Sequence, residues 1–380
     1  MSITVAVPRE RKEGELRVAL VPETAAKLAK QGFRVLVEAG AGTGACYADQ
    51  AYEEAGAVLI SDTRALYEQA DLVCKVQPPS PDEADMLKPG SVLVTVLQSH
   101  RHPELVARLR DRKVTVFAME LIPRITRAQS MDVLSSQATV AGYKGVLIAA
   151  ELCPRFFPML TTAAGTIRPA RVLILGAGVA GLQAIATARR LGAIVEAYDV
   201  RHATREQVES LGAKFLQVEL DAESEGGYAR ELTDEEKQRE QAMLWRSVDE
   251  ADVVVTTAQI PGREAPRLIT TAMVEGMKEG AVIVDLAAES GGNCELTVPG
   301  EHVVHNGVKI YGPLNLPSTL AVHASDMYSR NVYNFIGVLG EEESALTFNW
   351  EDEILAGSVV THEGEIKNQG VRELLERGQS

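Results

Sequence analysis

The sequence predicts an α/β fold in which two parallel sheets are each covered by helices. Short runs rich in valine, isoleucine and leucine alternate with helical patterns along almost the whole chain, as happens when each strand is followed by a crossover helix. A length of 380 residues is sufficient for two domains with separate cores. The run SVLVTVL at 91–97 lacks polar alternation, which is typical of a strand buried on both faces.

The first third of the chain contains five candidate strands separated by helical patterns. The strands are expected at residues 3–8, 34–39, 71–77, 91–96 and 114–120, and two of the helices at 22–32 and 103–112. A glycine cluster at Gly40, Gly42 and Gly44 follows the second strand, but its spacing favours a tight loop. We expect this stretch of the chain to form most of a first domain.

A long helical pattern at 135–152 has no strand partner, and we interpret it as the crossover into a second domain. A loop rich in proline, threonine and glycine is expected at 153–169. Six candidate strands follow, at residues 171–175, 193–199, 213–218, 252–257, 281–286 and 308–312. Six strands are the number in a complete doubly wound parallel sheet.

The end of the chain contains a helical pattern at 318–338, a short strand and a polar tail. Because the second domain is complete with its sixth strand, the chain is expected to return to the first domain. We therefore predict a discontinuous first domain of residues 1–134 and 317–380, with a second domain of residues 135–316 inserted into it. The polar and charged segment 221–241 is expected to be a long loop, and such loops inside compact domains are often functional.

Composition and charge exclude several classes of protein. A formal net charge of -15 opposes binding to nucleic acid or to an anionic membrane surface. The four cysteines form no CxxC pair, and His302 and His305 flank a strand-like pair that directs their rings to opposite faces, so no metal site is expected. The start of the chain does not resemble a signal peptide, and no apolar run reaches the ~20 residues needed to span a bilayer. Any membrane segment is therefore expected on another chain.

A glycine-rich turn joins the first strand of the second domain to the helix that follows it. Gly176 permits the tight turn, Gly178 lets the backbone approach a pyrophosphate, and Gly181 allows close packing of helix on strand. The next strand ends at Asp199, about 20 residues after the turn, as a dinucleotide-binding motif requires. The alternative is a glycine turn that binds no nucleotide. The full context favours a Rossmann-type dinucleotide site.

Asp199 also distinguishes the two nicotinamide dinucleotides. Its carboxylate can accept hydrogen bonds from both adenosine ribose hydroxyls, whereas it would repel a 2′-phosphate by up to ~4 kcal/mol at ~4 Å in an effective dielectric of ~20. Arg201 could attract that phosphate, but we regard the carboxylate as decisive and predict NAD(H). The residues of this region that we assign to the cofactor are Gly176, Gly178, Val179, Gly181, Asp199, Val200 and Arg201.

A polar stretch lies between the two predicted domains, where a cleft would open. It reads MELIPRITRAQSMDVLSSQ at 119–137. Spacing alone also allows a polar loop followed by a helix N-cap at Ser130 or Asp132. The stretch closely resembles the corresponding loop of the NAD(H)-binding component of proton-translocating nicotinamide nucleotide transhydrogenases. The resemblance covers nearly the whole chain, and its most specific elements are RxxRAQSMDxLSSQ, GGYA at 226–229 and TTAQIPG at 256–262.

The resemblance implies two Rossmann-like domains and a homodimer without membrane spans. Such a dimer would dock with a separate NADP(H)-binding component and with membrane-spanning subunits that translocate protons. The chain would then be cytoplasmic and peripherally associated with the inner membrane through its partners. In the family, hydride passes directly between NAD(H) on this component and NADP(H) on the partner. Such a transfer needs no proton acceptor, nucleophile or metal, because the chemistry belongs to the cofactors.

The resemblance also assigns four residues to the reaction. Arg124 and Ser135 would hold the nicotinamide end of NAD(H). Asp132 would fix the loop, and Gln129 would reach the NADP(H) bound on the partner. Seven further residues match nucleotide contacts of the family, with Gly227 and Tyr228 in a mobile loop that closes over the nucleotide. They are Ile125, Thr126, Arg127, Gly227, Tyr228, Gln241 and Gln259.

The same two-domain layout resembles alanine dehydrogenase, which oxidises a small amino acid with NAD. Arg17 and Lys75 match that family's substrate-gripping residues, but both also occur in the transhydrogenase pattern, and here they are interpreted as structural residues paired with carboxylates. The catalytic histidine of alanine dehydrogenase aligns with Gln98, which cannot relay a proton, and its aspartate aligns with Glu289. His100 could occupy the same strand face as Gln98. A non-catalytic NAD(H)-sensing module is a third alternative.

Overall fold

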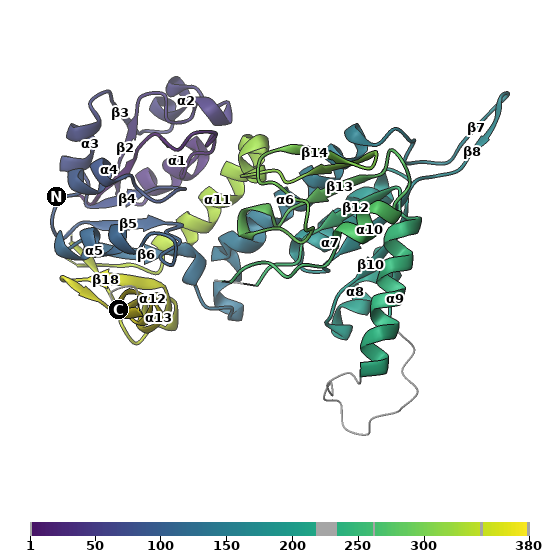
Figure 1. The fold of residues 1–380 in the computed structure, drawn as a ribbon. Coiled ribbons are helices and arrows are strands. Elements are labelled where there is room, and N and C mark those ends of the chain that lie inside the picture. The colour runs from purple at the N-terminus through teal and green to yellow at the C-terminus, as the bar shows by residue number, and fades with distance from the viewer. Residues whose placement is uncertain (1, 218–233, 261–262, 343–344, 378–380) are drawn as a thin grey trace. The chain divides into compact units, whose positions relative to one another are not determined.

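The computed structural model describes residues 2–217, 234–260, 263–342 and 345–377 (Figure 1). The chain divides into two compact units, which we call the first unit (Met1–Gln137 with Pro317–Ser380) and the second unit (Ala138–Leu316). The division lies inside helix α6 (Val133–Leu152), three residues beyond the boundary expected from the sequence. Across the described ranges, no helix is both long and apolar enough to cross a membrane.

The first unit is built on an eight-stranded sheet in the order β19-β18-β6-β5-β4-β1-β2-β3. Its strands are β1 (Thr4–Val7), β2 (Arg34–Glu38), β3 (Val58–Ile60), β4 (Leu72–Cys74), β5 (Val92–Thr95), β6 (Thr115–Ala118), β18 (Val359–His362) and β19 (Glu365–Ile366). Strands β1 to β6 are parallel and have the order 3-2-1-4-5-6 of a Rossmann sheet, whereas β18 and β19 pair antiparallel. The five predicted strands are confirmed. The pattern misses β3 because this edge strand has three residues and is only partly buried.

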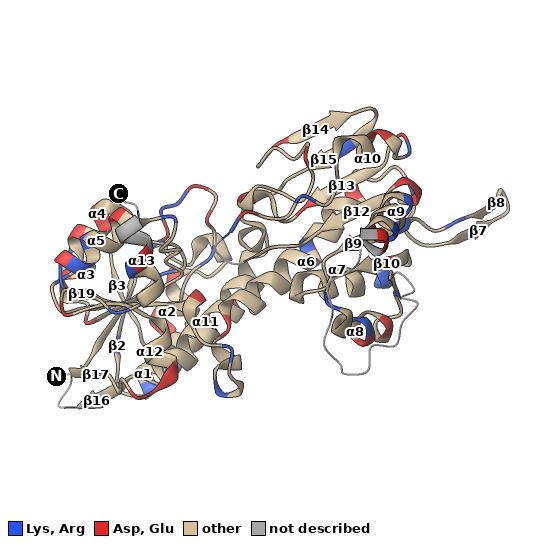
Figure 2. Cartoon of the chain, turned by 60° about the horizontal axis from the view of Figure 1, so that its bottom comes forward, with Lys and Arg blue, Asp and Glu red and all other residues tan. Residues whose placement is uncertain are grey.

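Helices cover both faces of the first sheet. One face packs against α1 (Pro22–Lys30), α2 (Asp49–Glu54), α11 (Ala321–Ile336) and α12 (Glu353–Ser358), and the other against α3 (Thr63–Gln69), α4 (Pro81–Met86), α5 (Pro103–Asp111) and α13 (Gln369–Arg377). Three of them begin with proline in the first turn, where no backbone donor is lost. Figure 2 shows acidic and basic residues interspersed on α3 and α5, which keeps their outer faces solvated.

The second unit contains a seven-stranded sheet in the order β11-β10-β9-β12-β13-β15-β14. Its strands are β9 (Arg171–Leu175), β10 (Ile194–Tyr198), β11 (Lys214–Phe215), β12 (Val253–Thr256), β13 (Val282–Asp285), β14 (His302–His305) and β15 (Val308–Tyr311). The six predicted parallel strands are confirmed, again in the order 3-2-1-4-5-6.

The prediction of a purely parallel six-stranded sheet is corrected by β14, which pairs antiparallel with β15. Asn306 and Gly307, both with positive φ, form the tight turn between them. An Asn-Gly pair between short apolar runs is a strong hairpin signal, and the strand itself begins and ends with histidine. His302 stacks on Tyr311 and His305 contacts Glu275, so the two rings serve separate packing roles.

Helices also cover both faces of the second sheet. Helices α6, α7 (Val179–Arg190) and α8 (Arg205–Ser210) pack on one face, and α9 (Asp234–Glu250) and α10 (Thr271–Gly276) on the other. The expectation of a loop through 221–241 is wrong for its last eight residues, because α9 begins at Asp234. These residues are good helix formers, and their charge alone suggested a loop.

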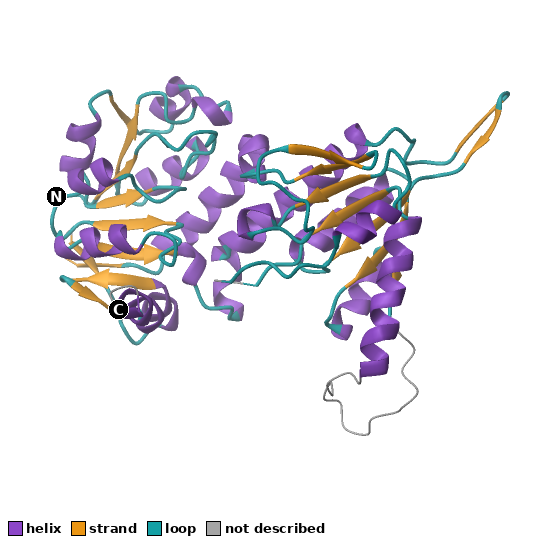
Figure 3. Ribbon diagram, in the orientation of Figure 1, coloured by secondary structure: helices purple, strands orange, loops and turns teal. Residues whose placement is uncertain are grey.

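The expected loop at 153–169 is also corrected. It contains a small antiparallel hairpin of β7 (Leu160–Thr162) and β8 (Gly165–Ile167), which extends away from the rest of the second unit (Figure 3). Its threonine-rich strands are exposed, so the sequence has no buried alternation to mark them. A second exposed hairpin joins β16 (Gly340–Glu342) to β17 (Ala345–Thr347).

Six short 3-10 helices complete the described structure: η1 (Thr43–Ala45), η2 (Met119–Leu121), η3 (Thr126–Met131), η4 (His202–Thr204), η5 (Ala288–Ser290) and η6 (Leu316–Leu320). The tight loop expected after the second strand corresponds to η1 and the turn before it. The helix expected at 318–338 begins with η6 and continues as α11.

Gly142, inside α6, permits a close approach to helix α7. A Cβ atom at this position would overlap the backbone of Ala180. We predict that Gly142→Ala lowers the free energy of unfolding by about 1–3 kcal/mol, because the overlap outweighs the ~1 kcal/mol that alanine gains in helix propensity. Chemical denaturation measures this. Gly276→Ala at the end of α10 is the control, since its Cβ would meet only Asp249 at 3.4 Å. Equal stability of Gly142→Ala and the parent would contradict the close contact.

Candidate functional site

The glycine turn of the second unit has the strand–turn–helix geometry that the sequence predicts. Gly176 has φ 101°, and a Cβ there would lie 2.5 Å from the hydroxyl oxygen of Thr257. A Cβ on Gly181 would overlap the carbonyl oxygen of Gly176, so helix α7 packs directly on the turn. Gly178 is the N-cap of α7, and the nearest atom to a Cβ there is a guanidinium nitrogen of Arg201 at 3.8 Å. The backbone at Gly178 is therefore open to an approaching anion at a helix N-terminus.

Asp199 follows β10 and is connected to the glycine turn. One carboxylate oxygen accepts from the backbone N–H of Ala177 at 2.7 Å and from Arg201 at 2.9 Å, and the other accepts two further bonds from Arg201. Burial opposes ionisation, but the bonds from Arg201 and Ala177 outweigh it and lower the pKa of Asp199. The carboxylate is 7% exposed and the Arg201 side chain 61% exposed. A ribose can therefore replace the guanidinium without disturbing the anchored carboxylate.

Apolar side chains lie next to this turn. Val179 is 42% exposed at the start of α7, and Val200 is 73% exposed directly after Asp199. Valine at this exposure leaves apolar surface in water, which a bound aromatic base would cover.

A second loop at the same edge of the sheet is fixed by two buried polar residues that the sequence analysis misses. Asp285 ends β13 and accepts hydrogen bonds from the hydroxyls of Thr256 and Thr297 and from three backbone N–H groups. Asn293 donates to the carbonyl of Ala258 at 2.8 Å and accepts from its N–H at 3.0 Å. The signal in the sequence is an aspartate at the end of the buried run VIVD. This arrangement holds the loop that carries Gln259.

The remaining predicted nucleotide contacts of the second unit differ in how they are placed. Gln259 is exposed, and its amide donates to the carbonyl of Leu286 at 3.0 Å. Gln241 is exposed on α9, directly after Glu240, which accepts a hydrogen bond from Tyr198 of β10. Gly227 and Tyr228 lie outside the described residues.

The RAQSMD segment of the first unit is a short helix with one buried side. Within η3, Ala128 and Met131 are 2% and 6% exposed in the core, whereas Gln129 is exposed. Asp132 then caps α6, because its carboxylate accepts the backbone N–H of Ser135 at 2.9 Å and its hydroxyl at 2.6 Å. Of the two possible capping residues, the structure therefore selects Asp132. Gln129 is presented on the outer side of the segment.

The residues before the segment are placed differently from one another. Arg124 and Thr126 are exposed, and Ile125 packs partly buried against the core of the first unit. The guanidinium of Arg127 makes two parallel hydrogen bonds, 2.8 and 2.6 Å long, to the carboxylate of Asp352. This pairing favours an anchoring role for Arg127 over the predicted contact with the nucleotide.

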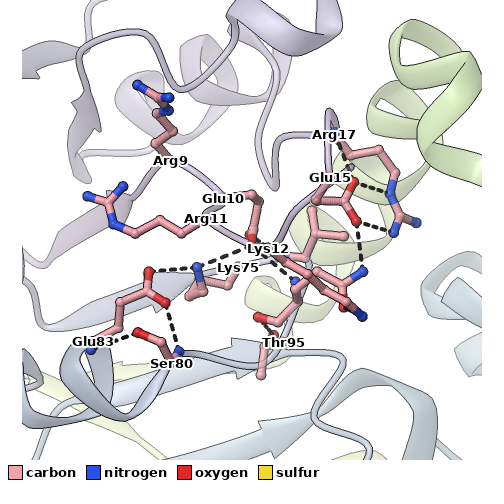
Figure 4. Close-up of polar contacts among 12 residues, drawn as sticks. Arg9, Glu10, Arg11, Lys12, Glu15, Arg17, Lys75, Ser80, Glu83 and Thr95 are labelled. Carbon is pink, nitrogen blue, oxygen red and sulfur yellow. Dashed lines mark hydrogen bonds and ion pairs between the residues drawn. The ribbon is translucent and has the colours of Figure 1, made fainter. Parts of the chain in front are cut away.

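A buried charged cluster occupies the edge of the first sheet where the chain leaves β1 and β4 (Figure 4). The ammonium of Lys75, 1% exposed, lies 3.2 Å from Glu10 and 3.0 Å from Glu83. Arg17 donates to both carboxylate oxygens of Glu15, at 2.8 and 2.7 Å. Burial alone would weaken these charges, but the mutual attraction raises the pKa of Lys75 and lowers that of Glu83.

The cluster confirms that Arg17 and Lys75 are paired with carboxylates. Burial opposes the ionisation of Glu15, yet the hydrogen bonds and charge of Arg17 outweigh it and lower the pKa of Glu15 to about 2. The sequence offered no signal for these partners beyond the charged run near the N-terminus, which holds Glu10 and Glu15. Both cations are consequently occupied by the protein itself.

The residues that align with the acid–base pair of alanine dehydrogenase are not arranged for proton transfer. Strand β5 ends at Thr95, so the expectation that Gln98 and His100 share a strand face is wrong. Gln98 has a left-handed backbone, φ 51°, and begins a turn that exposes His100. Glu289 is exposed and accepts the backbone N–H of Asn315 at 2.6 Å. In the described stretches of the chain, no three His, Cys, Asp or Glu side chains gather as a metal site.

The strand order, the glycine turn and Asp199 together define a Rossmann-type dinucleotide-binding α/β protein. Two family models match the chain: Alanine dehydrogenase/PNT, N-terminal domain, over residues 6–141, and Alanine dehydrogenase/PNT, C-terminal domain, over residues 145–369. The chain belongs to this family, which confirms the resemblance seen in the sequence.

Relatives and solved structures divide between the two branches of the family. An NAD(P) transhydrogenase subunit alpha of Rhodospirillum rubrum is 49% identical over 372 residues, covering 95% of this chain and 97% of that protein. A crystal structure of transhydrogenase from Sinorhizobium meliloti aligns with a TM-score of 0.85 at 42% identity, covering 97% of this chain and 99% of that one. Alanine dehydrogenase from Halomonas elongata is 31% identical, covering 97% of this chain and 96% of that protein.

The depressed pKa of Glu15 makes a prediction for acid stability. Because the folded pKa of about 2 is below the ordinary 4.5, the contribution of this carboxylate is present above pH ~4.5 and is lost as the pH falls toward ~2. We expect the difference in unfolding free energy between the parent and Glu15→Gln to shrink by about 1 kcal/mol from pH ~7 to pH ~4.

Denaturant unfolding at the two pH values measures that difference. Glu23→Gln, in an exposed ion pair with Lys27, is the control and should change stability little at either pH. A difference for Glu15→Gln that stays constant between the two pH values would contradict the assignment.

Proposed function

We propose that this chain is the NAD(H)-binding component of an NAD(P) transhydrogenase, in which hydride passes directly between NAD(H) on this chain and NADP(H) on a partner component. The observation that carries the proposal is the combination of an open Rossmann glycine turn with an outward-facing RAQSMD segment. The glycine turn supplies the dinucleotide site, and the segment supplies hydrogen-bonding residues outside it. The identity of 43–49% to transhydrogenase alpha subunits over almost the whole chain supports the same conclusion.

The nucleotide is assigned to the edge of the second sheet. Gly176, Gly178 and Gly181 cradle the pyrophosphate, and Asp199 accepts the adenosine ribose hydroxyls once Arg201 has moved aside. Val179 and Val200 pack against the adenine. Gln241 and Gln259, with Gly227 and Tyr228, complete the contacts of the second unit. Ile125 and Thr126 are assigned to the nucleotide from the first unit.

The reaction is assigned to the segment around η3. Arg124 and Ser135 hold the nicotinamide end, Asp132 fixes Ser135, and Gln129 reaches the NADP(H) of the partner. NAD(H) supplies the hydride, which needs the two nicotinamide carbons ~3–3.5 Å apart in a defined orientation. The side chains have to orient both rings and exclude water, for which amides, hydroxyls and a guanidinium are suited at neutral pH. No proton has to move on the chain in this step.

The partners follow from the proposed reaction. The NADP(H)-binding component and membrane-spanning subunits that couple the transfer to proton translocation are separate chains or segments, and this chain associates with them at the cytoplasmic face of the membrane. We also propose a homodimer. Its support is the exposed hairpin β7–β8, where Phe156, Met159 and Ile167 are 56%, 64% and 45% exposed. Apolar side chains so exposed on a projecting element are typical of an interface.

Alanine dehydrogenase activity is the second candidate, favoured only by the shared fold. The charged cluster opposes it, because Glu10, Glu15 and Glu83 occupy the cations that would hold a substrate carboxylate. A pure NAD(H) sensor is also disfavoured, since a sensor does not need to present Gln129 outward.

The test is hydride transfer from NADH to NADP⁺ by the purified chain, with and without an NADP(H)-binding partner component. We expect transfer only with the partner and no alanine-dependent reduction of NAD⁺ in either case. Absence of transfer with a competent partner would overturn the proposal. Alanine oxidation by the chain alone would place it in the other branch of the family.

Asp199→Asn should shift the choice of dinucleotide. Asparagine still accepts from Ala177, but it removes the repulsion of a 2′-phosphate and releases Arg201, so the affinity ratio of NADPH to NADH should rise at least about tenfold, or about 1.4 kcal/mol. Equilibrium binding by nucleotide fluorescence measures the ratio. Glu206→Gln, exposed on α8, is the charge-matched control and should leave it unchanged. An unchanged ratio for Asp199→Asn would remove Asp199 from the ribose site.

A further inference from the structure

The RAQSMD segment is held in place by residues that lie about 200 positions later in the chain. We infer that Asn331 and Asp352 are positioning residues for hydride transfer, which clamp the two ends of η3 and thereby aim Gln129. This inference rests on the proposed function. It assigns a task in the reaction to the portion of the first unit that follows the inserted second unit.

Asn331 fixes the end of the segment. It lies on α11 and is 7% exposed. Its amide nitrogen donates to the carbonyl of Ser130 at 2.8 Å, and its amide oxygen accepts from the hydroxyl of Ser136 at 2.7 Å. One buried side chain thus bridges the residue after Gln129 and the first turn of α6. Asn334, one helical turn later, donates to the same Ser130 carbonyl at 3.1 Å.

Asp352 fixes the beginning of the segment. Its two carboxylate oxygens accept the parallel bonds from Arg127, and one of them also accepts the N–H of Ile354 as the N-cap of α12. The hydrogen bonds from Arg127 lower the pKa of Asp352, despite its burial, so the carboxylate stays charged at neutral pH. Arg127 is the more exposed partner, at 56% against 14%, so the carboxylate is the fixed half of the pair.

The clamp leaves one residue to act. Arg127 is held by Asp352, Ala128 and Met131 are buried, and the backbone of Ser130 is held by Asn331. Gln129 is the exposed side chain in the middle of these anchors. Because its neighbours on both sides are fixed, the amide of Gln129 is confined to a narrow range of directions. Displacing a reacting group by ~1 Å can cost about a hundredfold in rate.

The experiment uses the full chain with its NADP(H)-binding partner and compares Asp352→Asn, Asn331→Asp and the parent. Asparagine at 352 can still cap α12 but loses its charge for Arg127. Aspartate at 331 keeps the acceptor for Ser136 but has no donor for Ser130. We expect single-turnover hydride transfer to slow by about ten- to a hundredfold. The dissociation constant of NADH should stay within about twofold, because neither residue touches the nucleotide.

Two variants separate positioning from general destabilisation. Asp352→Glu restores the charge and should recover most of the rate. Asp85→Asn removes an exposed ion pair with Arg108 on the same unit, 2.7 Å long, and should leave the rate unchanged. A loss of rate in Asp352→Asn that is matched by an equal loss of NADH affinity, or that Asp352→Glu does not recover, would overturn the inference.

Amide hydrogen exchange tests the clamp independently of activity. Exchange of the peptides that cover 126–131 should accelerate in Asp352→Asn and Asn331→Asp, but not in Asp85→Asn. Unchanged exchange in the two clamp variants would refute the clamp itself. If the parent transfers no hydride although exchange responds as expected, the clamp stands and the proposed function is wrong.

Discussion

Both sheets contain a point at which neighbouring parallel strands send their chains to opposite faces. It lies between β1 and β4 in the first unit and between β9 and β12 in the second. The crossovers diverge there, so the carboxyl edge of each sheet has a crevice that must be filled by protein or by a ligand. In the second unit, Gly176 and Gly181 draw backbone and helix together and leave the Gly178 side open. In the first unit, Glu10 and Lys75 fill the equivalent position. The two units share a topology and differ in what occupies this point.

The charged filling of the first unit is held together by its own electrostatics. A lysine as buried as Lys75 would be costly without partners, and removing one member of a buried pair typically costs ~3–5 kcal/mol. Glu10 also accepts the backbone N–H of Val76, and Glu83 accepts the hydroxyl of Tyr67, so the carboxylates are tied to β4 and α3 as well as to the lysine. Arg17 and Lys75 can therefore be retained for stability, whichever reaction the family member performs. Their presence in a sequence does not distinguish the two branches; their partners in the structure do.

The features that sequence reasoning identified are those written in local spacing. The buried valine runs mark both parallel sheets, and the glycine spacing with Asp199 marks the dinucleotide site. The hairpin β7–β8 has no buried face, so periodicity could not reveal it. Asn331 and Asp352 are invisible for another reason, since their contacts with Ser130 and Arg127 span 201 and 225 positions. Polar partners so distant in sequence follow only from the fold, as does the anchoring of the loop after β12 by Asp285 and Asn293.

The insertion of one unit within the other gives the segment around Gln129 an unusual dependence. Residues 126–131 precede the second unit, whereas α11 and Asp352, which hold them, follow it. The segment is therefore made early in synthesis and obtains its anchors only after the whole inserted unit has been made. Contacts of such large sequence separation form late in folding, because their loop-closure entropy must first be overcome. A hydride-transfer site that needs orientation more than acid–base chemistry is thus completed by the last elements to fold. The discontinuity of the first unit couples the geometry of Gln129 to the integrity of the entire chain.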